Sequence, residues 1–168
     1  MKKIFALLCF LPFFSQAQQL EAGANFGNAT TGSLAIRFNG CLKAGIGYEM
    51  ANFTAVTIPG DGHINVKMGM PFLFIDQYKH VRKHEFYYGL DAGKIYLRNK
   101  TDFAYYQDEN GFEIGAHAGY SLQIIGPLYA NAQVGFQYYR CTVNARNTSA
   151  TTDGFFVPLS IGAHLILF

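Results

Sequence analysis

Strict alternation of apolar and polar residues is the feature that most restricts the fold of this chain. Between residues 111 and 124 every second position, from Phe112 to Ile124, is apolar or aromatic, and the positions between them carry Gly, Glu, His, Ser and Gln. Successive side chains of a β-strand point to opposite faces, whereas a helix would mix the two sets. This segment is therefore expected to be a strand with one apolar face.

The same period of two recurs along the chain, without an intervening helical pattern. Turn signals at Asn39-Gly40 and Gly126-Pro127 separate neighbouring segments. The pattern predicts eight strands, near residues 19–28, 32–39, 41–56, 63–75, 85–99, 111–125, 128–143 and 155–168. The predicted fold class is all-β, an eight-stranded antiparallel up-and-down β-barrel. Pro71 and Pro158 lie inside predicted strands, where proline is expected at bulges or strand ends.

The first 17 residues have the organisation of a secretory signal peptide. Two lysines precede the apolar run 4–14, and small residues at 15 and 17 suit cleavage before Gln18. We therefore expect a signal peptide over 1–17 and a barrel domain over 18–168. Loss of Lys2 and Lys3 reduces the 13 Lys and Arg residues to 11, which equals the number of Asp and Glu residues. The barrel then has no basic excess, and no nucleic-acid partner is expected.

Composition indicates which face of the barrel meets lipid. Hydrophobic residues make up 50% of the chain and charged residues only 14%, against about 25% charged in an ordinary soluble domain. In a secreted lipocalin-like barrel, the alternative architecture, the polar face meets water. The polar face here is dominated by Gly, Ser, Asn and Gln rather than by Lys and Glu. We therefore expect a transmembrane barrel with its apolar face outward, because a closed barrel satisfies its backbone in lipid.

On most segments the apolar face is unambiguous. In 63–75 the apolar set is taken to be the one containing Met68, Met70, Phe72 and Phe74. Aromatic residues lie on the apolar faces, several near strand ends, as in the aromatic girdles of membrane barrels. They include Tyr48, Tyr88, Tyr120, Tyr138, Phe112 and Phe136.

The connections between strands alternate in length, as in outer-membrane barrels, whose periplasmic turns are short and whose outer loops are longer. The first set is 39–41, 76–84 and 126–127; the second is 29–31, 57–62, 100–110 and 144–154. Successive strands run in opposite directions, so the connection 76–84 must lie at the same end of the barrel as the short turns, although it is long and basic.

The polar face supplies the residues of the lumen, which in an eight-stranded barrel is just wide enough for side chains to fill. The charged residues expected there are Glu21, Arg37, Lys43, Glu49, Lys67, Asp91, Glu113, His117 and His164. By strand position, Glu21, Arg37, Lys43 and His164 should lie near the end with the short turns. Lys67, Asp91 and His117 should share a middle height, with Glu49 near Lys67. Because unpaired buried charges are very costly, we predict a paired network that fills the lumen and prevents conductance.

Several segments resemble the small outer-membrane β-barrel domain proteins of Bacteroidota, with an OmpA/OmpX-like eight-stranded architecture. They are the secretory start, Met70-Pro71-Phe72-Leu73-Phe74, 86–93 and the terminal 161–168. The resemblance covers the barrel domain and implies the cell outer membrane as location. It also implies that the barrel-assembly machinery recognises the terminal Phe168. That residue is out of phase with Val157, Leu159, Ile161, Ala163 and Leu165.

No catalytic, cofactor-binding or metal-binding residues are predicted. Ser121 with His117, and Ser160 with His164, are each four strand residues apart, about 13 Å, whereas a nucleophile and its base must lie within ~3 Å. Asp91 and His117 could touch across neighbouring strands, and structural pairing is the favoured interpretation.

Three further groups of residues are not expected to form a metal site or a disulfide. His80 and His84 lie in a basic turn, where a metal ion would be repelled. The acidic cluster Asp102, Asp108 and Glu109 lacks the ligand spacing of a calcium loop. Cys41 and Cys141 are expected at opposite ends of the barrel, too far apart for a disulfide.

The function that the sequence favours is a non-enzymatic outer-membrane barrel presenting loops for envelope integrity or partner contact. A lipid-modifying enzyme or small-solute channel is the alternative, and a secreted lipocalin-like carrier of apolar ligands is the third. The expected partners are outer-membrane lipid, the barrel-assembly machinery during insertion and an extracellular or envelope protein. We expect a monomer without cofactors.

Overall fold

The computed structural model describes residues 17–38, 41–58, 62–99, 109–145 and 148–167, and all regular structure in these ranges is β-strand. The strands are β1 (Ala17–Gly27), β2 (Ala29–Phe38), β3 (Leu42–Ile58), β4 (Gly62–Val81), β5 (His84–Asn99), β6 (Glu109–Ile125), β7 (Leu128–Ala145), β8 (Thr148–Phe156) and β9 (Leu159–Leu167). The predicted signal peptide, except Ala17, and Phe168 lie outside the described residues.

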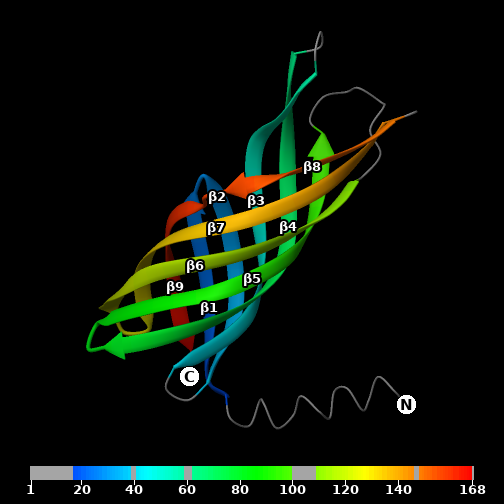
Figure 1. The fold of residues 1–168 in the computed structure, drawn as a ribbon. Coiled ribbons are helices and arrows are strands. Elements are labelled where there is room, and N and C mark those ends of the chain that lie inside the picture. Colours follow the sequence, from blue (N-terminus) through cyan, green and yellow to red (C-terminus); the bar gives the residue numbers. More distant parts are fainter. Residues whose placement is uncertain (1–16, 39–40, 59–61, 100–108, 146–147, 168) are drawn as a thin grey trace, which may run out of the picture.

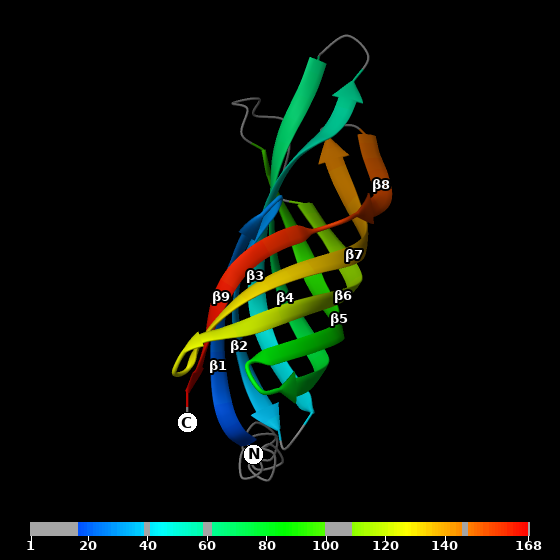
Figure 2. The same cartoon turned by 90° about the vertical axis from the view of Figure 1, so that its left-hand side faces the viewer.

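The strands form one closed antiparallel barrel (Figures 1 and 2). Each strand from β1 to β7 pairs with the next, and β9 closes the barrel by pairing with both β1 and β7. β8 pairs with the C-terminal half of β7, from Gln137 to Ala145. β8 and β9 are thus two halves of one final strand, and the predicted all-β, eight-stranded up-and-down barrel is confirmed.

The final strand is interrupted at Val157 and Pro158, as proline at a strand end predicts. The side chain of Asn28, between β1 and β2, bridges the interruption: its Nδ2 donates to Val157 O and its Oδ1 accepts from Leu159 N, both at 2.8 Å. Gly27 is required beside it, because a Cβ there would lie 1.9 Å from Leu159 O. The β1–β2 connection is therefore held directly against the final strand.

Three tight connections define one end of the barrel, here called the turn end. β4 continues to Val81 and β5 begins at His84, so that only Arg82 and Lys83 form the turn. The predicted long connection 76–84 is therefore wrong, because residues 76–81 extend the strand pairing with β5. The turn requires a left-handed backbone at Arg82, with φ of 58°, as does the next turn at Gly126, with φ of 52°.

The opposite end, here called the rim, is formed by hairpins that extend beyond the closed barrel. The β3–β4 hairpin projects farthest (Figure 1), and its strand pairing continues to Ile58 and Gly62. The described residues of the predicted loops 57–62 and 144–154 are strand, since β3 runs to Ile58, β4 begins at Gly62, β7 runs to Ala145 and β8 begins at Thr148. Most of the predicted loop 100–110 lies outside the described residues.

The outer surface of the barrel is apolar, as predicted. Exposed side chains include Leu73, Leu90, Ile114, Phe136 and Ile161, of which Leu90 is 61% and Ile161 70% exposed. The faces of β5, β6 and β7 are as the alternation indicates. The apolar set chosen for β4 is wrong: Met68 and Met70 are buried inside, Phe72 and Phe74 are half-buried, and Leu73 and Ile75 face outward.

Aromatic residues gather on the outer surface near both ends of the closed barrel. Toward the turn end, Phe86 packs on Tyr120 with ring centroids 5.2 Å apart. Toward the rim, Phe155 stacks on Phe136 at 5.0 Å and contacts Tyr138. Such a distribution is typical of side chains at the two interfaces of a bilayer. Within the described ranges no helix combines the length and the hydropathy needed to cross a membrane.

Candidate functional site: the barrel lumen

The lumen is lined by charged and polar side chains carried by every strand of the closed barrel. The inward position on each strand follows from the pleat, which sends alternate residues to the interior. The buried polar residues are Glu21, Arg37, Lys43, Glu49, Asp76, Glu85, Asp91, Glu113, Ser121, Gln137 and His164. Among the described residues, six buried carboxylates therefore face two buried residues with a permanent positive charge, Arg37 and Lys43.

Arg37 on β2 and Lys43 on β3 connect carboxylates from opposite sides of the lumen. Arg37 Nη1 donates to Glu21 Oε2 at 2.7 Å, and its Nη2 donates to Glu85 Oε2. Lys43 Nζ lies 3.1 Å from Glu21 Oε1 and 3.2 Å from Asp76 Oδ2. Because every partner is buried, these contacts occupy a medium in which charges interact more strongly than in water.

His117 on β6 extends this network toward the middle of the barrel. Its Nε2 lies 2.8 Å from Asp76 Oδ1 and its Nδ1 lies 2.7 Å from Asp91 Oδ1. Close strand approach makes room for the contact, since a Cβ at Gly89 would lie 2.1 Å from Asp76 Oδ1. The result is one continuous chain of polar contacts from Glu85 to Asp91, here called the lumen network.

Two tyrosines pack against the cations of the lumen network. The guanidinium of Arg37 lies 4.1 Å from the ring centroid of Tyr78, and Lys43 Nζ lies 4.4 Å from that of Tyr87. Stacking of this kind holds a cation in place and offsets part of the cost of its burial. Beside the network lies a polar cavity of about 50 Å³, lined in part by Asn131 and Gln133, large enough for a few water molecules.

Nearer the rim the side chains that fill the lumen change from charged to apolar. Gln137 Nε2 donates to Glu49 Oε2 at 3.3 Å, and Glu113 is buried close by. Above them an apolar cluster fills the barrel. It contains Ala29, Ala51, Met68, Met70, Ile95 and Cys141, with Phe72, Tyr139 and Phe156 packed against it. Met70 and Ile95 are fully buried, so this cluster separates the lumen network from the rim.

The sequence placed most of the lumen network correctly. Glu21, Arg37 and Lys43 lie together near the turn end, and the predicted contact between Asp91 and His117 is confirmed. Glu49, Glu113 and His164 are buried as predicted.

Lys67 was placed wrongly. Strand pairing aligns it with Arg98, whereas Asp91 is aligned with Phe74, so that Lys67 shares neither the height of Asp91 and His117 nor that of Glu49, which pairs with Met70. The cause is that β4 continues to Val81 rather than ending near residue 75, which places Lys67 farther from the turn end than predicted.

Two members of the network, Asp76 and Glu85, were missed because both flank the segment interpreted as a long turn. A signal for each was present. Asp76 follows Phe72 and Phe74 at every second position, and Glu85 lies an even number of positions before Asp91, so each belongs to the same face as those residues. Extending the period of two through 76–84 would have identified both residues as inward.

Ser121 and His117, one of the serine and histidine pairs considered from the sequence, do not contact each other through the imidazole nitrogens. Both ring nitrogens of His117 are held by carboxylates, which leaves neither to act on Ser121. Ser121 pairs across strands with Glu85 and Asn131. Cys41, exposed at the turn end, and Cys141, buried toward the rim, are not joined by a disulfide, as predicted.

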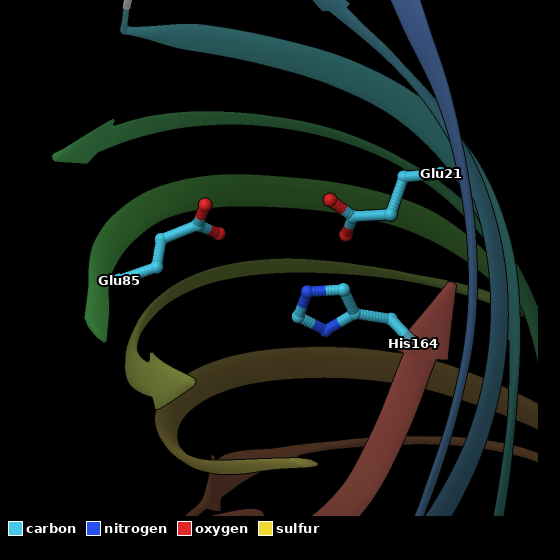
Figure 3. Close-up of side chains that lie close together, drawn as sticks. All are labelled: Glu21, Glu85 and His164. Carbon is cyan, nitrogen blue, oxygen red and sulfur yellow. The ribbon is translucent and has the colours of Figure 1, made fainter. Parts of the chain in front are cut away.

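One group in the lumen has the composition of a metal-binding site. Glu21, Glu85 and His164 come from β1, β5 and β9, and one ligand atom of each lies within 4.8 Å of the others. In Figure 3 the two carboxylates point toward one another and the imidazole of His164 lies beside them. Tyr129 stacks on His164 with a centroid distance of 5.1 Å.

An apolar exterior around a closed barrel with a charged, filled lumen defines the class of transmembrane β-barrels. The fold is similar to that of a major outer membrane protein from Thermus thermophilus, with a TM-score of 0.55 and 11% identity, covering 89% of this chain and 98% of that chain. It is also similar to Neisserial surface protein A, with a TM-score of 0.54 and 13% identity, covering 88% and 92%. No family model matches the sequence, and no curated protein does. The chain thus has the fold of small outer-membrane barrels, as the sequence predicts.

Proposed function

We propose that this chain is a non-enzymatic barrel of the cell outer membrane that has a closed lumen and carries hairpins and loops to the cell surface. The observation that carries the proposal is the reversal of burial: apolar side chains such as Leu90 and Ile114 are exposed, whereas Glu85 and Glu113 are buried. This is the opposite of a water-soluble barrel, and it argues against the lipocalin-like carrier.

The outer membrane is the location that agrees best with this architecture. Closed barrels satisfy all backbone hydrogen bonds among their strands, so that lipid can surround them. The aromatic residues near both ends, among them Phe86, Tyr120 and Phe155, suit the two interfaces. Recognition by the barrel-assembly machinery belongs to the proposal, as do contact with outer-membrane lipid and a monomeric state. The assignment to Bacteroidota stays a prediction.

A closed lumen is supported by two barriers in series. Arg37 joins Glu21 to Glu85 across the interior near the turn end. Toward the rim, Met70 and Ile95 are fully buried in the apolar cluster. An ion entering from either end would meet paired charges or packed side chains. The small-solute channel is therefore the weaker alternative.

The surface role is proposed for the rim, where the β3–β4 and β7–β8 hairpins extend beyond the barrel (Figure 2). Strand-borne hairpins hold their tips away from the membrane, which suits contact with an extracellular or envelope protein or a contribution to envelope integrity. The carboxylate contacts of His117 argue against the lipid-modifying enzyme.

Two measurements test the proposal. The protein should fractionate with the outer membrane and migrate differently in detergent gels before and after boiling, because a folded barrel resists detergent. Recordings from planar bilayers should show no steady single-channel current. Recovery in the soluble periplasmic fraction would contradict the location. Steady open currents would contradict the closed lumen, and altered lipid A masses in a deletion strain would favour the enzyme.

A further inference from the structure

His164 and Glu85 each direct an unsatisfied polar atom into the same part of the lumen. His164 is 3% exposed and Glu85 is fully buried. Nevertheless His164 Nε2 and Glu85 Oε1 make no hydrogen bond within the described structure. Buried polar atoms normally have a partner, and leaving one without costs on the order of 1–3 kcal/mol. These two atoms and the carboxylate of Glu21 are therefore suited to share one bound cation.

We propose that Glu21, Glu85 and His164 form a binding site for a divalent transition-metal ion, with Zn²⁺ as the preferred ion. Their ligand atoms lie within 4.8 Å of one another, and Figure 3 shows the three side chains converging from separate strands. Imidazole nitrogen and carboxylate oxygen are both zinc ligands in proteins, and three protein ligands with an open fourth position are typical of catalytic zinc sites. The inference is independent of the proposed surface role.

The cations near the group leave the necessary oxygens available. Arg37 contacts Oε2 of Glu21 and Oε2 of Glu85, so that Oε1 of each carboxylate can turn toward the ion. Lys43 lies 3.1 Å from Glu21 Oε1, but it also lies 3.2 Å from Asp76 Oδ2. When Glu21 binds the ion, Lys43 keeps Asp76 as its partner. Arg37 then orients both carboxylates by hydrogen bonding, as outer residues commonly do around metal ions.

Charge in the lumen also favours a bound cation. Around the site, three buried carboxylates, Glu21, Asp76 and Glu85, face two permanent cations, Arg37 and Lys43. An uncompensated buried charge is strongly destabilising. A divalent ion at Glu21 and Glu85 reduces this excess without requiring a further protein residue.

The geometry needs only a small contraction. Ligand atoms around a tetrahedral ion bound at about 2.0–2.2 Å lie roughly 3.3–3.6 Å apart. The two glutamates can close the remaining distance by side-chain rotation, while Tyr129 holds the imidazole from one face. Three protein ligands leave a fourth position for water.

His80 is an exposed histidine whose side chain lies close to Glu85. This residue is 41% exposed on the side chain, and its Nδ1 lies 3.8 Å from Glu85 Oε2. Its ring also meets the edge of Tyr129, which stacks on His164. His80 thus contacts the buried Glu85 from the exposed turn end.

The test uses the protein folded in detergent micelles, without a histidine tag. Titration calorimetry with Zn²⁺ should show one equivalent bound, and Co²⁺ should give the visible absorption of a tetrahedral nitrogen–oxygen site. His164→Gln and Glu85→Gln should each weaken Zn²⁺ binding at least tenfold. His84→Gln is the matched control, because His84 lies at the same end but contacts Tyr120 instead; it should change the affinity less than threefold.

Folding of each variant is checked by heat-dependent gel migration. Should a variant fail to fold, Co²⁺ is added to the unmutated barrel, and the imidazole protons of His164 should show the largest paramagnetic shifts. The proposal is overturned if the folded protein binds no Zn²⁺ at micromolar concentrations. It is equally overturned if binding survives His164→Gln and disappears with His80→Gln or His84→Gln, since the ion would then sit on the turn.

Discussion

Arg37 and Glu85 form an ion pair across the barrel, although β3 and β4 separate their strands in the sheet. The pair therefore spans the lumen rather than reinforcing neighbouring strands. Because Arg37 also binds Glu21 on β1, one guanidinium joins the neighbouring strands β1 and β2 to β5 on the other side of the lumen. This contact ties opposite sides of the barrel wall together through the interior.

Removal of Arg37 should be strongly destabilising. Arg37→Met leaves two buried carboxylates without their main partner, and loss of one member of a buried pair typically costs about 3–5 kcal/mol. Urea unfolding in detergent or lipid vesicles measures this cost. The double variant Arg37→Met with Glu85→Gln should be more stable than the sum of the two single effects. Strict additivity would show that the pair does not exist.

Gly89 should tolerate no side chain. In Gly89→Ala the new Cβ would lie 2.1 Å from Asp76 Oδ1 and 2.4 Å from Ile75 O. Asp76 must then move away from His117, and we expect a loss of more than about 1 kcal/mol, as for other overpacked interior positions. Gly32→Ala is the control, since nothing lies within 4 Å of its added Cβ; its unfolding midpoint should hardly change. Equal effects at both glycines would contradict the structure.

A charge on the outer surface should disturb insertion in lipid far more than in detergent. Leu90 is 61% exposed on the outer face of β5, where it pairs with Ile75 and Ala116. Leu90→Arg should cost roughly 2–4 kcal/mol in a bilayer, as charges near the midplane of membrane barrels do. Lys79→Arg, which keeps an exposed charge near the turn end, is the control. A harmless Leu90→Arg would mean that this face is not in lipid.

The apolar cluster toward the rim should behave as a packed core. Ile95 is fully buried there, so that Ile95→Ala should cost about 2–5 kcal/mol through lost contacts and a residual cavity. Ile114→Ala, at a position 57% exposed on the outer face, should cost less. Unfolding measured for both variants in the same vesicles gives the comparison, and a larger cost at Ile114 would refute the assignment of the cluster.

Asn28 should stabilise the interruption of the final strand through both ends of its amide. Asn28→Ala removes two hydrogen bonds, to Val157 and Leu159, each worth about 0.5–1.5 kcal/mol. Amide hydrogen exchange at Leu159 should accelerate. Asn28→Asp keeps the acceptor for Leu159 but loses the donor to Val157, so that its effect on this amide should be smaller. Unchanged exchange in the alanine variant would exclude the bridge.

Alternation predicted the barrel because period two is a direct consequence of the strand pleat. It predicted the outer surface for the same reason, and the low charge of the chain decided which face meets lipid. Alternation cannot choose between two faces when both are apolar, as on β4, where Phe72 and Phe74 face inward and Leu73 and Ile75 outward. Only the register with β3 and β5 decides that choice.

The lumen network shows a second limit of prediction from sequence, which concerns contacts between strands that are not neighbours. His117 and Asp91 lie on adjacent strands, so that their shared inward face and their similar distance from the strand ends were enough to predict the contact. Arg37 and Glu85 lie on strands that are not neighbours in the sheet, and their contact depends on barrel closure and on side-chain length. The same holds for Glu21, Glu85 and His164, whose convergence is invisible until β9 closes on β1.

The interruption at Val157 and Pro158 divides the final strand into parts with different partners. β9 closes the cylinder with β1, whereas β8, among the described strands, pairs with β7 alone. The rim hairpin thus makes no strand pairing with β1 among the described residues, and its length does not set the shear of the closed barrel. Peptide insertions between β7 and β8 should therefore leave the barrel intact, which makes this hairpin a suitable platform for displaying foreign epitopes on a cell.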